Sequence, residues 1–126
     1  MNYLCLCHYD PAHFATLSPE QLAAIPGLCA PHDAALHASG HLVAVGSLAE
    51  ADRFAVIRPG EGAPVVTRGP IADTPEPFGA FFIVEADSLD EAVAIAALHP
   101  SAHLGRFFGG GVEVRPCESY EGPRNL

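Results

Sequence analysis

Histidine is the residue type in this sequence best suited to proton transfer, because imidazole exchanges a proton near neutral pH. The chain has seven histidines among 126 residues. His32 shares the three-and-four spacing of one helix face with Leu28 and Leu36. On that face His32 could point into a cleft as a general base, or it could be a buried histidine held by hydrogen bonds.

Two carboxylates and an arginine could act with such a base. Asp73 and Glu76 lie between residues 68 and 77, a stretch that its prolines and glycine mark as a loop. They could orient an imidazole or accept a proton, although a turn-forming Asp and a solvated Glu are the simpler interpretation. Arg115 could bind an anionic substrate as a bidentate pair, or make an ordinary pair on an exposed edge.

The first predicted strand carries His8 on one face and two cysteines on the other. His8 alternates with Leu4 and Leu6, which places it where it could contact a substrate, whereas Cys5 and Cys7 point to the opposite side. Such side chains cannot easily converge on one tetrahedral ion, and there is no C-x-x-C pair, so we predict no metal site. The glycines of residues 109–111 lack the lysine and helix start of a phosphate loop, and we predict no cofactor.

Charge and composition restrict the partners of the chain. The formal charge is −9, from 15 acidic and 6 basic side chains, and it disfavours nucleic acid and anionic lipid surfaces. No apolar run approaches the length of a membrane helix, and four dispersed cysteines form no dense disulfide framework. We therefore expect a cytoplasmic protein that binds a small molecule or another protein.

Local patterns predict alternating strands and helices. Ser18 and Gln21 form a capping box, Pro26-Gly27 is expected to bend or break the helix that starts there, and Ser88-x-x-Glu91 begins a second helix. Apolar runs bounded by turn residues indicate the strands. The expected elements are a strand at 3–9, a bent or broken helix from 18 to 40, a strand at 42–48, a hairpin of 53–58 with 65–67, a strand at 78–86, a helix from 88 to 100 and a strand at 112–116.

This order predicts an α+β fold with the ferredoxin-like split βαβ arrangement, in which two helices cover one face of an antiparallel sheet. We expect a single domain over residues 1–118 and a loose C-terminal tail over 119–126. Both side-chain parities of strand 78–86 are apolar, so the second face of the sheet must also be covered. A second copy of the chain is the simplest cover, and we predict a homodimer.

The C-terminal half resembles the YCII-related (DGPF) family. The run Thr67-Arg68-Gly69-Pro70-Ile71-Ala72-Asp73-Thr74-Pro75-Glu76 is similar to the family signature Asp-Gly-Pro-Phe-Ala-Glu-Thr-Lys-Glu, and Val112-Glu113-Val114-Arg115-Pro116 is similar to its Glu-x-Arg-Pro ending. Arg68 replaces the signature aspartate, so the role of that aspartate does not transfer to this position. The resemblance implies a dimeric α+β barrel with a cleft and a histidine–carboxylate proton-transfer site.

Two functions fit these observations. The first is a cofactor-free lyase or isomerase acting on a small organic acid, with His32, Asp73 and Glu76 as catalytic residues and with Arg115 and His8 binding the substrate. The second is a non-catalytic module that binds a small metabolite or regulates a protein partner. The missing signature aspartate favours the second more than it would for a typical relative.

Overall fold

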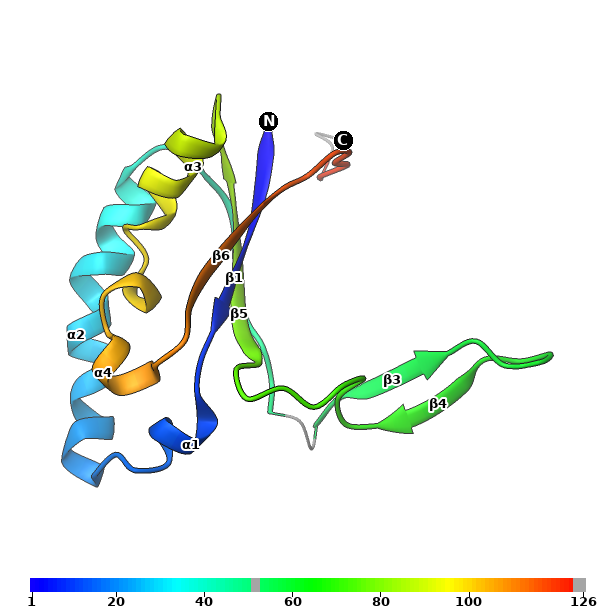
Figure 1. Ribbon diagram of the computed structural model, residues 1–126. Helices are drawn as coiled ribbons and strands as arrows, with labels where there is room; N and C mark the ends of the chain where they lie inside the picture. Colours follow the sequence, from blue (N-terminus) through cyan, green and yellow to red (C-terminus); the bar gives the residue numbers. More distant parts are fainter. Residues whose placement is uncertain (51–52, 124–126) are drawn as a thin grey trace.

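The computed structural model describes residues 1–50 and 53–123, and its main elements follow the predicted order. Within these residues four strands form one sheet and two more form a separate hairpin (Figure 1). The elements are β1 (Asn2–His8), α1 (Pro11–Phe14), α2 (Pro19–Ala38), β2 (Leu42–Ser47), β3 (Ala55–Arg58), β4 (Val65–Arg68), β5 (Phe78–Glu85), α3 (Leu89–Ala96), the 3₁₀ turn η2 (Pro100–Ala102), α4 (Gly105–Phe108) and β6 (Gly111–Pro116).

The main sheet is antiparallel, with the strand order β2-β5-β1-β6. One connection between sheet strands contains α2, which follows β1, and another contains α3, which follows β5. Both helices lie on the same side of the sheet, and the other side carries no helix (Figure 1). The predicted α+β, split βαβ arrangement with two helices on one face is therefore confirmed.

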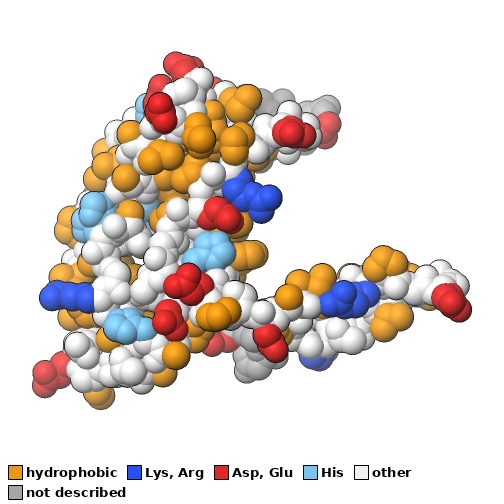
Figure 2. Space-filling model, in the orientation of Figure 1, with side chains coloured by type: hydrophobic (Ala, Val, Ile, Leu, Met, Phe, Trp, Pro, Cys, Tyr) orange, Lys and Arg blue, Asp and Glu red, His pale blue; other side chains and the backbone are white. Residues whose placement is uncertain are grey.

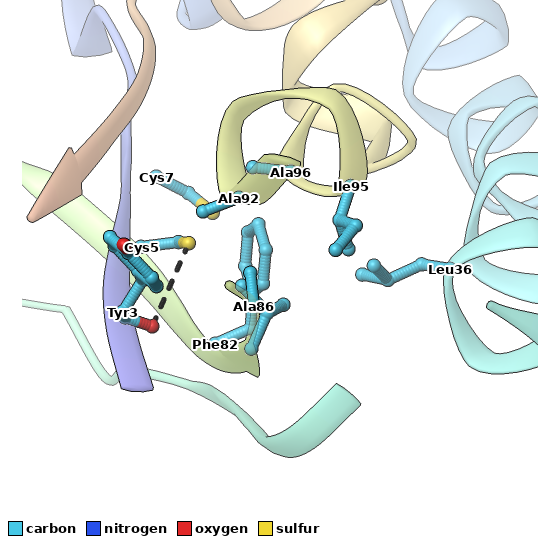
Figure 3. Close-up of a cluster of buried hydrophobic side chains, with 10 residues drawn as sticks. Tyr3, Cys5, Cys7, Leu36, Phe82, Ala86, Ala92, Ile95 and Ala96 are labelled. Atoms are coloured by element: carbon cyan, nitrogen blue, oxygen red, sulfur yellow. Dashed lines mark hydrogen bonds between the residues drawn. The ribbon is translucent and has the colours of Figure 1, made fainter. Parts of the chain in front are cut away.

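The core lies between the sheet and the two helices. Alternate side chains of β1 and β5 point toward the helices, and Phe82 and Cys5 are fully buried there. Figure 3 shows Phe82 among side chains from β1, α2 and α3. The buried cluster comprises Tyr3, Cys5, Cys7, Leu36, Phe82, Val84, Ala86, Ala92, Ile95 and Ala96. The two cysteines are thus small core residues, as their alternation suggested.

A bent or broken helix was predicted at Pro26-Gly27, and α2 is not broken there. It runs without interruption from Pro19 to Ala38 and contains both Pro26 and Pro31. The predicted capping box is present, since Ser18 accepts from the Gln21 N–H and the Gln21 side chain accepts from the Ser18 N–H. Each of the two prolines removes one backbone hydrogen bond, and the capping box and the buried Leu36 support a helix that continues past both.

Helix α3 begins at the predicted cap but buries a different face from the one its larger side chains suggest. The Ser88 hydroxyl accepts a hydrogen bond from the Glu91 N–H at 3.1 Å. Ala92 and Ile95 face the core, whereas Leu89 and Val93 are exposed. The small alanines let α3 approach the sheet closely, and the two exposed apolar side chains remain on its outer surface.

The sheet face opposite the helices, which we call the open face, is apolar at its centre. Leu4 and Leu6 on β1 pair with Ile83 and Phe81 on β5, and paired residues share a face. The Phe81 ring lies over Gly46 of β2, where an added Cβ would be 2.5 Å from the ring. Glycine is required there by this contact, which holds Phe81 flat against the open face.

Strands β3 and β4 form an arm that projects from the domain on the side of the open face (Figure 1). The predicted hairpin and its turn are confirmed at this position. Val66 and Ile57 form one cross-strand pair of the arm, and both are more than half exposed. The arm therefore presents apolar side chains to solvent.

The short elements α1, η2 and α4 were not predicted, because segments of three or four residues leave no periodic pattern in a sequence. Residues 119–123 contain no helix or strand, and the remainder of the predicted tail, 124–126, lies outside the described residues. In the part of the chain that the structure describes, no helix is both long and apolar enough to span a bilayer.

Candidate functional site

His8 is the candidate site residue with the most defined surroundings. It is the last residue of β1 and lies on the open face, where its ring contacts the edge of Phe78 at 5.8 Å between centroids. Its Nδ1 donates a hydrogen bond to the Glu76 main-chain carbonyl oxygen at 2.7 Å. Its Nε2 lies 3.6 Å from Oε1 of Glu113 on the neighbouring strand β6. The imidazole is thus fixed on one side and faces a carboxylate on the other.

A shallow hollow of about 350 Å³ lies beside the His8 ring. It is lined by His8, Glu76, Gly110, Gly111, Val112 and Glu113. Figure 2 shows histidine, acidic and basic side chains close together over β1 and β6. The hollow can hold a few atoms of a small molecule in contact with both the imidazole and the carboxylate.

Gly110 allows the chain to pass close to His8. Its φ is +60°, a conformation that side chains with a Cβ rarely adopt, and an added Cβ would lie 2.1 Å from the His8 carbonyl oxygen. The glycine run between α4 and β6 therefore lets the chain pass close to the end of β1. This close contact fixes the position of the His8 backbone.

Arg115 lies on the same face of β6 as Glu113, two residues further along the strand. At the rise of an extended strand, their Cα atoms are about 7 Å apart. Arg115 is exposed and pairs in register with Leu4, so its guanidinium can reach a molecule on the open face. A carboxylate is the group that this side chain would bind best.

Asp73 and Glu76 both lie in the predicted loop between β4 and β5, and both side chains are exposed. Glu76 contributes its main-chain carbonyl to His8, and its own N–H donates to Thr74 Oγ1 at 3.3 Å. The sequence predicted a role for the Glu76 carboxylate, but the Glu76 group that contacts His8 is its main-chain carbonyl. The predicted catalytic role of the two carboxylates remains a prediction.

His32 lies on α2, on the helix-covered side of the sheet. It is half-buried, and its ring stacks on His103 with 4.5 Å between centroids and 11° between planes. Among the described residues no hydrogen bond or ion pair joins His32 to Asp73 or Glu76, so the structure does not bring the three predicted catalytic residues together. A role for His32 as a base remains a prediction.

The half-buried His99 lies beside Cys7, whose side chain belongs to the buried core. The His99 ring stacks on Phe82 at 4.7 Å, its Nδ1 accepts from the Ser101 N–H, and its Nε2 lies 3.8 Å from Cys7 Sγ. Burial lowers the pKa of His99, which the more distant Asp33 carboxylate partly offsets. Burial also raises the pKa of Cys7 to about 11. Both groups are therefore neutral near pH 7, which does not suit a thiolate nucleophile.

No group of three or more His, Cys, Asp or Glu side chains is arranged to hold a metal ion within residues 1–50 and 53–123. Sequence reasoning did not identify Glu113 as a site residue. A signal for it was present, since Glu113 and Arg115 alternate on the wet face of the last strand while His8 has the matching parity on the first.

Comparison with known proteins agrees with the family resemblance. A sequence profile of the YCII-related domain matches residues 1–117. An uncharacterized protein of Rhizobium meliloti (strain 1021) is 28% identical over 121 residues, covering 96% of this chain and 95% of that protein. A solved structure of 5-chloro-2-hydroxyhydroquinone dehydrochlorinase (TftG) from Burkholderia phenoliruptrix AC1100, in complex with 2,5-dihydroxybenzoquinone, superposes with a TM-score of 0.49 at 20% identity, covering 94% of each chain. On the match over residues 1–117, this chain belongs to the YCII-related domain family.

Proposed function

We propose that this chain is a cofactor-free lyase or isomerase in which His8 transfers a proton on a small organic acid. The orientation of the imidazole supports this proposal. A carbonyl oxygen cannot donate, so the bond to Glu76 requires a proton on Nδ1, and the neutral ring then carries its lone pair on Nε2. That nitrogen faces Glu113, which lines the hollow together with His8, and a general base must have such an accessible lone pair.

Glu113 and Arg115 supply the two charges that such a reaction needs. When Nε2 takes a proton, the imidazolium is stabilised by the Glu113 carboxylate at 3.6 Å. Arg115, on the same face of β6, would bind the carboxylate of the substrate and orient its reacting carbon toward His8. The substrate class is therefore a small acid whose reacting C–H is acidified by a neighbouring carbonyl group.

The reaction begins when His8 Nε2 removes the proton from that carbon and the electron pair forms an enolate. In an isomerase the imidazolium returns the proton to a different carbon or to the other face of the same carbon. In a lyase the electron pair expels a leaving group from the adjacent carbon, and the imidazolium protonates the leaving group. In both cases His8 ends neutral, and no external oxidant or reductant is needed.

The test is proton exchange in D₂O, followed by ¹H NMR on a panel of small 2-oxo and 3-oxo acids. We expect the wild-type chain to exchange the C–H signal of at least one member of the panel. His8→Gln should lower the rate by about a hundredfold or more, which is the usual contribution of a general base. Glu113→Gln should lower it less, because the base itself remains.

Two histidine variants serve as controls in the same assay. His37→Gln changes an exposed histidine on α2 and should exchange at the wild-type rate. If His32→Gln abolishes exchange while His8→Gln retains it, the base is His32 and the proposed assignment is wrong. Saturable binding of a panel acid with no exchange above the buffer rate would favour the non-catalytic alternative.

The oligomeric part of the proposal is a homodimer in which two open faces pack together. The apolar centre of the open face supports it, because Phe81 and Ile83 are only partly covered within one chain. Packing would also enclose the His8 hollow and exclude water from it. Light scattering at micromolar concentration should give twice the 13.2 kDa chain mass, and a value of one chain mass would contradict the dimer.

A further inference from the structure

The β3–β4 arm cannot be explained by contacts within its own chain. Ile57, Val65, Val66 and Ile71 are all more than half exposed, on both faces of the hairpin and at its base. An isolated two-stranded hairpin is only marginally stable in water. Among the described residues, the hydrogen bonds of the arm outside its ladder join only its own flanks, from Gly69 to Phe54 and from Arg58 to Ile71. The arm therefore needs a surface that another molecule provides.

The direction of the arm identifies that surface. It extends from one end of the sheet toward the side of the open face (Figure 1). Any body seated on the open face consequently lies beside the arm as well. If that body is a second copy related by twofold symmetry, the contact occurs twice, because each arm then lies against the other copy.

Charge favours a second copy of this chain as the occupant. The segment from Arg53 to Ile71 contains three of the six basic residues and one of the 15 acidic residues, so the arm is basic and the rest of the chain is strongly acidic. Figure 2 shows basic and apolar side chains along the arm. Within the described residues the ion pairs involve histidine only, so no carboxylate of the same chain pairs with Arg58 or Arg68, although Arg58 also donates to the Ile71 carbonyl. A basic arm and an acidic body are complementary between two copies.

The area available supports the same conclusion. Burying one Val or Ile side chain removes about 60–120 Å² from water. About six-tenths of each of the four side chains is exposed, so covering all eight on two arms would remove roughly 300–600 Å², well below the roughly 1,200 Å² that a stable interface needs. The arm is thus an addition to a larger contact, and the open face is the adjoining apolar surface that can provide the remainder.

We propose that the β3–β4 arm clasps a second copy of this chain seated on the open face, with the exposed apolar side chains of the arm packed against that copy and its arginines facing carboxylates of the partner's acidic body. This inference rests on the proposed dimer but not on the proposed chemistry. It assigns to the arm a role in holding the dimer together.

The first test measures the dimer dissociation constant by sedimentation equilibrium for an apolar double variant of the arm, a charge-reversed double variant of the arm and a control on α3. Ile57→Ser with Val66→Ser removes the exposed apolar pair from the arm, and Val93→Ser removes a valine that is 48% exposed on α3. We expect the arm variant to raise the dimer dissociation constant by about tenfold or more, and Val93→Ser to leave it unchanged. Arg58→Glu with Arg68→Glu should raise it as well, and the effect should shrink as salt is added. Circular dichroism establishes that each variant keeps its fold.

The second test locates the contact. Benzoylphenylalanine is placed at Ile57, ¹⁵N-labelled and unlabelled chains are mixed, and the cross-links are identified by mass spectrometry. The proposal predicts cross-linked peptides that pair one labelled with one unlabelled chain. The role of the arm would be overturned if the arm variants left the dimer dissociation constant unchanged, or if all cross-links lay within single chains. Neither result would overturn the dimer. A monomer at every concentration would overturn both.

Discussion

Replacing Gly110 by alanine should destabilise the domain by displacing the end of β1. The new Cβ would lie 2.1 Å from the His8 carbonyl oxygen and 2.5 Å from its carbonyl carbon, and neither backbone atom can move without disturbing the pairing with β6. The φ of +60° adds strain of about 1–2 kcal/mol for a residue with a Cβ. Overpacking costs about 1–3 kcal/mol more, so we expect a total loss of roughly 3 kcal/mol in the free energy of unfolding.

The adjacent Gly111 is a matched control. Its φ is not positive, and nothing lies within 4 Å of an added Cβ. Gly111→Ala should be neutral or should stabilise the domain by about 0.4–1 kcal/mol, because alanine restricts the unfolded chain.

Urea denaturation followed by circular dichroism measures both variants. At a slope of about 1–3 kcal/mol per molar urea, the Gly110→Ala midpoint should fall by roughly 1–3 M relative to Gly111→Ala. Equal midpoints for the two variants would refute the close approach at His8. The position of the His8 backbone would then not depend on its contact with Gly110.

Three further predictions concern stability and reactivity. Ser88→Ala should lower the free energy of unfolding by about 1 kcal/mol through loss of the α3 cap, measured by urea denaturation, and an unchanged midpoint would contradict the cap. Burial lowers the pKa of His99 below its ordinary value of 6.5, so as the pH falls the unfolded chain binds a proton at His99 before the folded chain does. The contribution of His99 to the free energy of unfolding should therefore be constant above pH 6.5 and should lower it as the pH drops below that value. His99→Asn, which keeps an acceptor for the Ser101 N–H, should flatten this dependence in thermal unfolding scans between about pH 5 and 7, and an unaltered slope would show that His99 is not its source. Iodoacetamide at about pH 8 should label Cys29 and Cys117 well before Cys5 and Cys7, because burial raises the pKa of Cys5 to about 12 and that of Cys7 to about 11. Mass spectrometry of tryptic peptides would follow the labelling. Equal labelling of all four cysteines in the folded protein would contradict the burial of Cys5 and Cys7.

The fold was predictable where local patterns determine it. The strand at the start of the chain, the Ser88 cap and the hairpin around residues 59–62 each depend on signals within about ten residues, and each is present. A bent or broken helix was predicted at Pro26-Gly27, and the break is absent because α2 is continuous from Pro19 to Ala38. The burial of Leu36 in the core, which helps to hold α2, depends on residues far away in the chain and has no counterpart in the local sequence.

The candidate site was predictable only in part, because its key contact joins distant residues through a main-chain atom. His8 and Glu76 are 68 positions apart, and the Glu76 atom that binds His8 is a carbonyl, which every residue possesses. Residue types pointed to His32 and to carboxylate side chains instead. The stacking of His99 on Phe82 was likewise not apparent, because the two residues are far apart in the sequence and no local pattern signals the contact.

The proposed chemistry requires His8 to be a base whose free nitrogen faces the open side of the sheet. Long-range ¹H–¹⁵N correlation spectra of the histidine rings at about pH 8 report which ring nitrogen carries the proton in the neutral form. The His8 signals, assigned by their absence from His8→Gln, should show the proton on Nδ1 and a free Nε2. A ring protonated mainly on Nε2 would mean that the bond to the Glu76 carbonyl does not form, and the assignment of His8 as the base would be wrong.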